Sequence, residues 1–509
     1  MKNRKAMISV MTAALFVLLT CASCGMTKEQ TKAGQSNAQA SETVKALAEQ
    51  QPVQVDDSDS IVITFNNSTA TVSGAGADAD GADVTIRTGG VYTVRGTTSD
   101  GRIVVDAGDE DVTLVLDNAQ IACADSSAIY VVSANKATVY AAENTQNTLT
   151  DGKTYNYDDA YSSKTEEEPN ACLYSKADLV LAGGGTLVVN GQSANGVTGK
   201  DTVRIESLTL TVNATNNGVT GKDSLTVKDA SVTVTAQGDA LRSTNDSDEN
   251  LGYVVADNVI FDLTSGEDGI SAQTYLSLSG TTVTVKAGGG SDAKISDDAS
   301  AKGLKAGTDI TIDDGSCTLD CADDTIHADG NVTVQSGTFK LTTGDDGVHA
   351  ENAVTVNDGD LTITGHEGIE GTLITLNGGN ISITASDDGI NAAQKTSGVT
   401  PTVEINGGEI EIEMGQGDTD GIDSNGDIII NGGTIRVTGQ SSFDYDGKGE
   451  LNGGTVYVNG QQVTELSNQF GGMGGRMGGM TGQFGQTPDG GMPQRGRFQN
   501  GASGTQPEF

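Results

Sequence analysis

The stretch Asp324-Thr-Ile-His-Ala328 is a short motif that returns three times, as Asp346-Gly-Val-His-Ala350, Glu367-Gly-Ile-Glu-Gly371 and Asp388-Gly-Ile-Asn-Ala392. The four starts lie 22, 21 and 21 residues apart. Each motif is followed by two short runs in which apolar and polar residues alternate, and this alternation predicts β-strands with one buried face. Because such short strands bury too little surface alone, the repeats must stack. The pattern therefore predicts an all-β parallel β-helix with ~22 residues per coil.

The same repeat extends well beyond this window. Earlier and later starts lie at Asn195, Asn217, Asp239, Asp268, Lys302 and Asp420, with a degraded start at Asp446. Strand patterns without the motif run from Ile61 to Thr150, which predicts irregular early coils or an end cap. We expect the β-helix to span residues 57–465. The Gly-, Met- and Gln-rich residues 466–509 have no strand pattern and are predicted to form a disordered tail.

The N-terminus has the features of a bacterial export signal. Residues 1–24 combine early basic residues with an apolar run that is too short to span a bilayer, which is typical of a secretory signal. The run ends in Cys21-Ala-Ser-Cys24, which resembles a lipoprotein processing box with Cys24 as the lipidated residue. Lipidation at Cys21 and a plain secretory signal are the alternatives. Residues 25–56 are predicted to form a flexible linker between a lipid anchor and the β-helix on the outer side of the membrane.

The charge of the chain limits its partners. Its 29 Lys and Arg residues face 69 Asp and Glu residues, a net charge of −40. Phosphate groups would be repelled, so nucleic acid and anionic membrane surfaces are excluded as natural partners, and contact with the membrane is expected only through the lipid anchor. The balance favours cations, or acidic ligands bridged by cations. Beyond the signal, Cys317 and Cys321 could face each other across a turn, or the cysteines could be small core residues.

Acidic residues recur at equal positions of consecutive repeats. Equal positions of stacked coils lie about 4.8 Å apart, where like charges repel strongly unless a cation bridges them. Ca²⁺ takes six to eight oxygen ligands, which such carboxylates could supply. The alternative is that Asp-Gly serves only as a turn with solvated side chains. The residues predicted to bind Ca²⁺ are Asp323, Asp324, Asp345, Asp346, Glu367, Asp387 and Asp388.

A second column of polar residues lies three positions after each start. It contains Arg242, Lys305, His327 and His349, which should point outward because each follows an inward apolar residue. These side chains are predicted to bind the carboxylates of an acidic carbohydrate. Arg242 and Lys305 are also the candidate bases if the protein is a pectate-type lyase, which needs a cation and a base near the abstracted proton.

Aromatic content bears on the carbohydrate. The chain has no Trp, and its aromatic residues make up 4% of the sequence. Neutral crystalline glucan is usually held by stacking on aromatic platforms, which are scarce here. The composition therefore favours an acidic glycan held through Ca²⁺.

Four segments support a resemblance to a known family. They are Gly89-Gly-Val-Tyr-Thr-Val94, Asp111-Val-Thr-Leu-Val-Leu-Asp117, Ala128-Ile-Tyr-Val131 and Glu143-Asn-Thr-Gln-Asn-Thr-Leu-Thr-Asp-Gly152, followed by the Asp-Gly-Ile repeats. Together they resemble a secreted bacterial carbohydrate-binding domain family first described from a cellulolytic clostridium. The resemblance covers roughly Ile61 to Gly460. It implies a right-handed parallel β-helix, similar in shape to pectate lyases, that carries calcium and binds acidic plant polysaccharide.

The residues and the resemblance lead to one expectation about function. We expect an extracellular, calcium-dependent carbohydrate-binding protein for acidic polysaccharide of the polygalacturonate type. The alternatives are a pectate-type polysaccharide lyase and a structural or adhesive surface solenoid with no glycan site.

Overall fold

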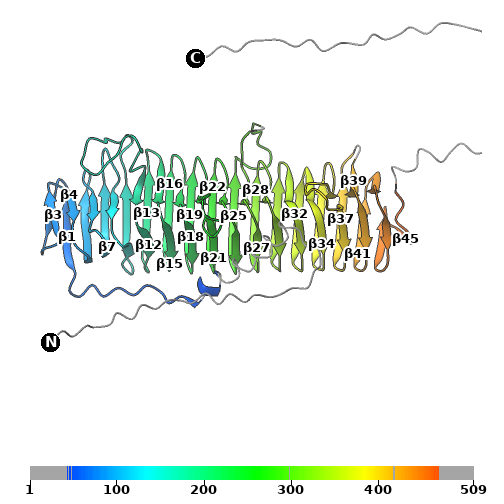
Figure 1. The fold of residues 1–509 in the computed structure, drawn as a ribbon, viewed down its shortest axis with the longest axis horizontal. Coiled ribbons are helices and arrows are strands. Elements are labelled where there is room, and N and C mark those ends of the chain that lie inside the picture. Colours follow the sequence, from blue (N-terminus) through cyan, green and yellow to red (C-terminus); the bar gives the residue numbers. More distant parts are fainter. Residues whose placement is uncertain (1–42, 44, 48, 297, 417–418, 469–509) are drawn as a thin grey trace, which may run out of the picture. The chain divides into compact units, whose positions relative to one another are not determined.

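The computed structural model describes residues 43, 45–47, 49–296, 298–416 and 419–468. Within this part of the chain the strands β1 to β45 form a single sheet, and helix occurs only at residues 43, 45–47 and 49. Strands three apart in sequence pair in parallel along most of the chain, which is the topology of a parallel β-helix, as predicted (Figure 1). No helix among the described residues is long and apolar enough to cross a membrane.

The solenoid has three faces, each a stack of parallel strands. The motif face contains the strands that begin each repeat. Its strands are β4 (Asp83–Ile86), β6 (Ile103–Asp106), β8 (Ile129–Ser133), β11 (Ala171–Ser175), β14 (Asn195–Gly199), β17 (Val219–Gly221), β20 (Leu241–Ser243), β23 (Ile270–Ala272), β26 (Leu304–Ala306), β29 (Ile326–Ala328), the first parts of β32 (Asp346–Val356) and β34 (Glu367–Leu376), β36 (Ile390–Ala392), β39 (Asp420–Ser424) and β42 (Ser441–Tyr445).

The second face follows the motif face in each coil. Its strands are β1 (Ile61–Asn66), β5 (Gly90–Thr98), β7 (Asp111–Ala122), β9 (Lys136–Ala141), β12 (Asp178–Ala182), β15 (Thr202–Glu206), β18 (Ser224–Lys228), β21 (Tyr253–Asp257), β24 (Leu276–Ser279), β27 (Ile310–Ile312), β30 (Asn331–Val334), the later parts of β32 and β34, β37 (Thr402–Ile405), β40 (Asp427–Ile430) and β43 (Gly449–Leu451).

The third face closes each coil and begins with the ends of β5 and β7, which pair with each other. Its strands are β10 (Gln146–Thr150), β13 (Thr186–Gly191), β16 (Thr209–Ala214), β19 (Ser231–Ala236), β22 (Ile260–Ser265), β25 (Thr281–Ala287), β28 (Gly315–Cys321), β31 (Thr338–Thr343), β33 (Asp360–Gly365), β35 (Asn380–Ala385), β38 (Glu409–Met414), β41 (Thr434–Thr438) and β44 (Thr455–Val458).

Antiparallel strands lie at both ends of the stack. β2 (Thr69–Val72) pairs with β1, β3 (Ala77–Asp80) pairs with β4, and β45 (Gln461–Val463) pairs with β44. These hairpins pair the outer strands of the terminal coils, whose exposed edges would otherwise invite association. Between them, the segment without the motif forms early coils of the same three-faced stack, so it is more than a cap.

Apolar side chains stack along the axis of the solenoid. On the motif face the inward residue of each strand pairs in register with the next, from Leu241 through Ile326 to Ile422, and all are fully buried. Cys123, Cys172, Cys317 and Cys321 are free and buried in this core. Burial raises the pKa of Cys317 to about 12, so these thiols are inert core residues.

The glycine of the motif is required by close packing. A Cβ atom on Gly347 would lie 2.3 Å from Cγ2 of Ile363 and 2.5 Å from the carbonyl oxygen of Gly368 in the next coil. This coil therefore has no room for a side chain at that position, whereas the equivalent positions of other coils hold the small, fully buried side chains of Ala240 and Thr325. The start at Asp446 was assigned wrongly: Asp420 pairs with Ser441, and Phe443 takes the inward position of Ile422. In this last coil the segment Ser441-Ser-Phe443 stands where the other coils have the motif. It does not match the Asp-Gly-Ile pattern, so the pattern did not predict it.

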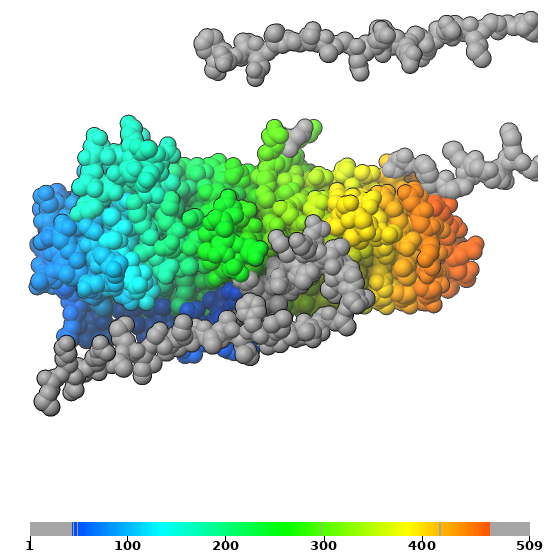
Figure 2. Space-filling model, in the orientation of Figure 1, coloured from blue at the N-terminus to red at the C-terminus, as the bar shows by residue number. Residues whose placement is uncertain are grey.

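Long excursions leave the coils between the third face and the motif face. Residues 151–170 connect β10 to β11, and residues 288–303 connect β25 to β26. Both project from the same side of the solenoid (Figure 2). The excursion at 151–170 reaches the motif face, because the Tyr130 hydroxyl donates a hydrogen bond of 3.0 Å to the carbonyl of Tyr161.

The described end of the segment predicted as a linker lies against the second face. Leu47 is buried in contact with Val255 and Tyr275, and the ammonium of Lys228 donates a 3.0 Å hydrogen bond to the carbonyl of Gln50. The predictions of a signal, of a lipidated Cys24 or Cys21, and of most of the tail fall on residues 1–42 and 469–509, outside the described residues.

Candidate functional site

One row of side chains runs outward along the whole motif face. Each member pairs in register with the next, and we call this set the face row. It consists of Tyr130, Tyr174, Thr198, Thr220, Arg242, Ser271, Lys305, His327, His349, Glu370, Asn391, Asp423 and Asp444. The row changes from aromatic through basic to acidic. All four predicted carbohydrate ligands, Arg242, Lys305, His327 and His349, therefore lie in one line.

The acids at the motif starts have a structural role. In several of them one oxygen accepts a hydrogen bond from the backbone N–H of the next start, at 2.9 to 3.1 Å. These bonds join Asp239 with Asp268, Asp324 with Asp346, and Asp388 with Asp420. Asn217 makes the same bond to Asp239 through its amide oxygen, so a negative charge is not required for it. The second carboxylate oxygen remains for other partners.

Basic members of the face row occupy some of these second oxygens. Arg242 Nη1 lies 3.4 Å from Asp239 Oδ2, and Lys305 Nζ lies 3.0 Å from Asp268 Oδ2. Lys305 also lies 3.0 Å from the hydroxyl of Ser300. Both candidate lyase bases are thus held in ion pairs as cations, whereas a base must be neutral to accept a proton.

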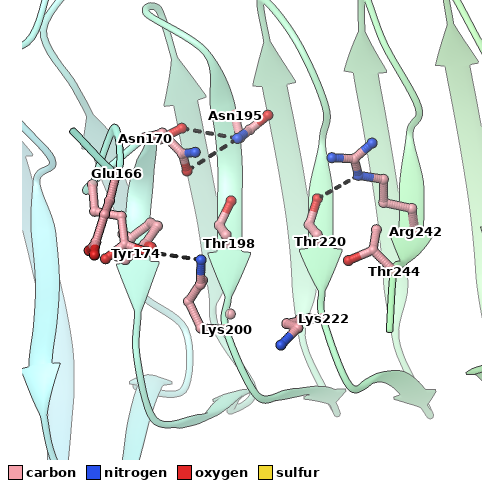
Figure 3. A pocket seen from close by; sticks show the side chains of 12 residues that line it. Glu166, Asn170, Tyr174, Asn195, Thr198, Lys200, Thr220, Lys222, Arg242 and Thr244 are labelled. Carbon is pink, nitrogen blue, oxygen red and sulfur yellow. Dashed lines mark hydrogen bonds and ion pairs between the residues drawn. The ribbon is translucent and has the colours of Figure 1, made fainter. Parts of the chain in front are cut away.

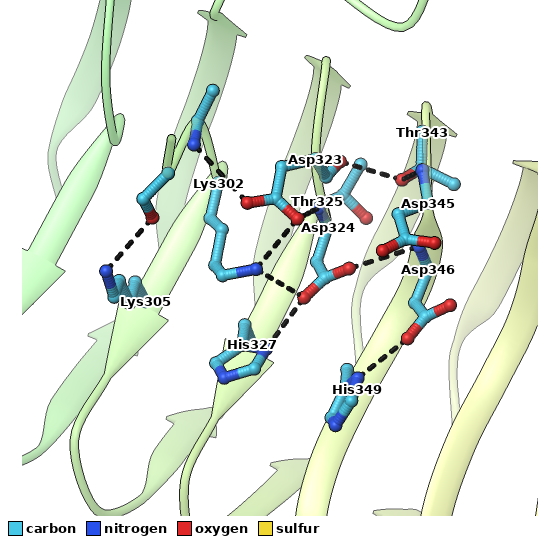
Figure 4. A network of polar contacts seen from close by, with 12 residues as sticks. Lys302, Lys305, Asp323, Asp324, Thr325, His327, Thr343, Asp345, Asp346 and His349 are labelled. Carbon is cyan, nitrogen blue, oxygen red and sulfur yellow. Dashed lines mark hydrogen bonds and ion pairs between the residues drawn. The ribbon is translucent and has the colours of Figure 1, made fainter. Parts of the chain in front are cut away.

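A polar network surrounds Asp324 (Figure 4). Asp324 Oδ2 is 2.7 Å from Lys302 Nζ and 2.7 Å from His327 Nδ1, and Lys302 Nζ is also 2.8 Å from Asp323 Oδ1. Burial opposes ionisation of Asp324, but the hydrogen bonds from His327 and Lys302 hold its pKa well below the usual range. For His327, burial is likewise outweighed by hydrogen bonds to Asp324 and Asp329, which raise its pKa to about 9. This part of the acidic column is neutralised by cations of the chain itself.

The next coil repeats the arrangement without the lysine. His349 Nδ1 lies 2.7 Å from Asp346 Oδ2 and 3.1 Å from Glu370 Oε2. Burial and the charges of Asp324 and Asp345 raise the pKa of Asp346 to about 6, despite the hydrogen bond from His349. Two equivalent aspartates therefore differ because only Asp324 has a lysine beside it.

Four groups of side chains have the spacing of a cation site, with one ligand atom per residue within 4.8 Å of the others. Two of them lie in the histidine networks above: Asp324 with His327 and His349, and Asp346 with His349 and Glu370. The other two are Asp323, Asp324 and Asp345, and His366, Glu367 and Asp387. Asp323 and Asp324 contact the ammonium of Lys302, whereas the described partner of Glu367 is the amide of Asn391, at 3.2 Å. The latter two groups include five of the seven predicted calcium ligands.

Burial and neighbouring negative charges disfavour ionisation of carboxylates in the later coils. Burial and the charge of Asp346 raise the pKa of Glu367 to about 8, and burial with the charges of Asp387 and Asp420 raises that of Asp388 to about 6. A divalent cation with oxygen ligands would relieve this repulsion, and carboxylates of this spacing fit the hard oxygen donors that Ca²⁺ prefers. The residues present thus fit the predicted ion.

A basic groove lies on the motif face beside the long excursion (Figure 3). It has a volume of about 150 Å³ and is lined by Tyr174, Lys200, Lys222 and Arg242. Lys200 and Lys222 follow the row residues Thr198 and Thr220 by two positions in consecutive coils. The sequence analysis missed these lysines, although their repeat at an equal position was a readable signal.

The excursion supplies an acidic group to the groove. Glu168 is buried and lies 2.8 Å from Lys176 Nζ and 2.9 Å from Lys200 Nζ. Burial opposes ionisation of Glu168, but the hydrogen bonds from Lys176 and Lys200 outweigh it and lower its pKa to about 2. Glu168 therefore holds two lysines in place at one end of the groove. The opposite end, at Lys222 and Arg242, is lined by hydroxyl groups.

Comparison with known proteins decides the family. The family model of carbohydrate-binding domain-containing proteins matches residues 80–347 and 345–464. The chain belongs to this family. A carbohydrate-binding domain-containing protein of Acetivibrio thermocellus is 38% identical over 133 residues, which are 26% of this chain and 45% of the relative. The match thus spans less than half of the length of that relative.

A solved structure is also similar to the chain. It is the polysaccharide lyase-like protein from C. thermocellum, determined as a gadolinium derivative. The similarity has a TM-score of 0.41 and 32% sequence identity, and it covers 45% of this chain and 92% of that protein.

Proposed function

We propose that this carbohydrate-binding protein takes an acidic polysaccharide along its motif face, with the sugar carboxylates in the basic groove. The observation that carries the proposal is the position of Lys200, Lys222 and Arg242, which line one groove from three consecutive coils. A linear polyuronate carries a carboxylate on every sugar, so cations repeated at the spacing of the coils suit it. Charge-assisted hydrogen bonds from lysine and arginine are about twice as strong as neutral ones.

We propose that calcium assists at the acidic groups. Asp323, Asp324 and Asp345 form one ligand set, and Glu367 and Asp387 form the other, with Asp346 and Asp388 beside them. Such an ion would relieve the repulsion that raises the carboxyl pKa values and would offer open coordination positions to sugar oxygens. The ammonium of Lys302 competes with the ion at the first set. The carboxylates of the second set have no lysine beside them among the described residues, so this set favours the ion more.

Binding is favoured over a lyase reaction in this proposal. Arg242 and Lys305, the two candidate bases, are ion-paired with Asp239 and Asp268. A base for proton abstraction must be present in its deprotonated form, and neighbouring carboxylates stabilise the protonated form of a lysine or arginine.

The direct test is retention of the mature chain on polygalacturonate, by affinity electrophoresis, with calcium and then with chelator. We expect strong retention with calcium, loss with chelator and a parallel fall in melting temperature, since a ligand at 100 times its Kd stabilises the fold by about 2.7 kcal/mol. Neutral dextran is the control polymer. The double variant Asp345→Asn and Asp387→Asn should reproduce the effect of the chelator.

Each outcome decides one part of the proposal. Retention that is unchanged by chelator would refute the role of calcium and leave the basic groove as the binding site. Absence of retention under both conditions would refute the acidic ligand and favour a structural solenoid. Formation of an unsaturated product during incubation would identify a lyase.

We propose that the protein acts outside the cell, held to the membrane by a lipid on Cys24. The export signal and the processing box are the support for this location. The variant Cys24→Ala should release the protein to the medium or leave it unprocessed. If the variant is still lipidated, Cys21 is the anchor.

A further inference from the structure

We propose that His327, His349, Asp329 and Glu351 bind one divalent transition-metal ion of the zinc type. This site lies between the basic and acidic parts of the face row. Its four ligands are not among the predicted calcium ligands, but its histidines contact two of those, Asp324 and Asp346. It does not depend on the proposed polysaccharide binding. Two imidazole rings and the five carboxylates that contact them form this part of the motif face.

The ligands come from equal positions of two consecutive coils. His327-Ala-Asp329 lies on and just after β29, and His349-Ala-Glu351 lies within β32. His327 pairs in register with His349, and their ring centroids are 4.7 Å apart. The repeat therefore places two His-x-acid segments side by side.

The Nε2 edge of each ring faces the carboxylate that lies two residues further along its own coil, and the two rings lie 4.7 Å apart between the coils. His327 Nε2 is 3.3 Å from Asp329 Oδ1, and His349 Nε2 is 3.7 Å from Glu351 Oε1. Two ligand atoms at about 2.0 Å from a tetrahedral zinc ion lie roughly 3.3 Å from each other. The side chains of Asp329 and Glu351 are 62% and 45% exposed, so both carboxylates have room to turn onto an ion.

The opposite edge of each ring is already held as in metal sites. His327 Nδ1 is 2.7 Å from Asp324 Oδ2, and His349 Nδ1 is 2.7 Å from Asp346 Oδ2. A carboxylate at Nδ1 accepts the Nδ1 proton, so Nε2 is the nitrogen left for an ion, and at His327 the ion displaces the proton that faces Asp329. Metal-bound histidines nearly always have such a carboxylate or carbonyl behind them, which orients the ring and raises its basicity.

His349 Nε2 is a buried polar atom that needs a partner. His349 is 9% exposed, and its Nε2 has no hydrogen-bond partner among the residues that the structure describes. Buried polar groups are normally satisfied, so an orphaned nitrogen calls for an explanation. A metal ion at Nε2 supplies that missing partner.

The donor set selects the class of ion. Ca²⁺ prefers oxygen ligands, whereas imidazole nitrogen suits zinc, copper, nickel and related ions. With two nitrogens and two carboxylate oxygens the coordination shell is complete, so the ion would clamp two coils together. The chain has three histidines, and the third, His366, is half exposed and lies 3.9 Å from Asp345 and from Asp387. Because His366 belongs to the cation group of Glu367 and Asp387, its variant reports whether the added metal binds there instead.

The test uses the mature chain after dialysis against chelator. Zn²⁺ is titrated by calorimetry, and Co²⁺ by the visible absorption of tetrahedral cobalt, both in excess Ca²⁺. We expect one ion per chain. His349→Gln, His327→Gln and Glu351→Gln should each weaken binding by at least about tenfold, and Asp346→Asn by about 10- to 100-fold through the loss of ring positioning. His366→Gln should bind like the wild type.

The melting temperature of each variant without metal shows whether it folds. Glu351→Gln changes a half-exposed side chain, so a loss of binding in this variant reports on metal ligation. No saturable binding of either ion would overturn the inference, and so would equal binding by wild type and His349→Gln. A loss in His366→Gln as large as that in His349→Gln would place the ion elsewhere and also overturn it. Because polygalacturonate retention is measured separately, neither result depends on the other.

Discussion

Two parts of the motif face share one backbone and differ in charge. The coils from β11 to β20 carry Lys200, Lys222 and Arg242 around the basic groove, whereas the coils from β34 to β42 carry Glu370, Asp423 and Asp444 in the face row. The strands stack in the same way throughout, and the inward residues are buried in both parts.

The two parts also shift the pKa of a buried carboxyl group in opposite directions. Glu168 beside the groove has a pKa of about 2, because its two lysines outweigh the effect of burial. In the acidic part, burial and the charges of Asp388 and Asp444 raise the pKa of Asp423 to about 7. Stacking demands apolar volume inside the coils and leaves the outward positions free to take any charge, so one scaffold can present two surfaces.

The largest expected effect tests whether the two parts share one core. Leu241→Ala in the basic part and Ile422→Ala in the acidic part both truncate fully buried side chains. Each should cost about 2–5 kcal/mol of stability through lost burial and a cavity, measured by guanidinium unfolding. Thr235→Ala, at an exposed position, should change stability by less than about 0.5 kcal/mol. A much smaller cost at Ile422 would mean that the parts differ in packing as well as in charge.

The next effect concerns the ligand. The triple variant Lys200→Ala, Lys222→Ala and Arg242→Ala should weaken oligogalacturonate binding by about 100-fold in calcium-containing buffer, since two or three charge-assisted contacts are lost. Calorimetry measures the change. The opposite variant, Glu370→Gln with Asp423→Asn and Asp444→Asn, should bind as the wild type does. If the second variant loses more affinity than the first, the acidic part is the binding surface.

A smaller effect follows from Glu168. Glu168→Gln removes the partner of Lys176 and Lys200 and should cost about 2 kcal/mol at pH 7. The folded pKa of about 2 is below the usual 4.5, so this contribution is present above pH 4.5 and is lost as the pH falls toward 2. Urea unfolding at several pH values should show the two proteins converging in acid. A cost that stays constant down to pH 2 would exclude the ion pairs as its cause.

The smallest effect has the opposite sign. The folded pKa of Asp423, about 7, is above the usual 3.8, so its charge destabilises the folded state above pH 7 and this penalty disappears as the pH falls toward 4. Without divalent ions, Asp423→Asn should stabilise the protein at pH 8 by about 1 kcal/mol and by nothing at pH 4. Glu411→Gln, on an exposed side chain of β38, should show no such gain. Destabilisation at pH 8 would show that Asp423 has a partner in the folded state.

The repeat of the sequence was sufficient to predict the architecture. A period of 21 to 22 residues with alternating strands predicts a β-helix, because only stacked coils bury the apolar face of every strand. Once the coils stack, residues at equal repeat positions become neighbours. For this reason the row of Arg242, Lys305, His327 and His349 was predictable without coordinates.

Three features depended on the tertiary structure. Glu168 comes from a long excursion without repeat, so only the folded loop brings it to Lys176 and Lys200. Some carboxylates of the acidic column are neutralised and others repel one another, depending on where Lys302 places its ammonium. The position of that ammonium cannot be predicted from the sequence, because the lysine side chain is flexible. The orientation of the two imidazole rings depends on which nitrogen each buried aspartate holds. Period determines which residues are neighbours along the stack, whereas loop conformation, rotamer and burial determine what those neighbours do to one another.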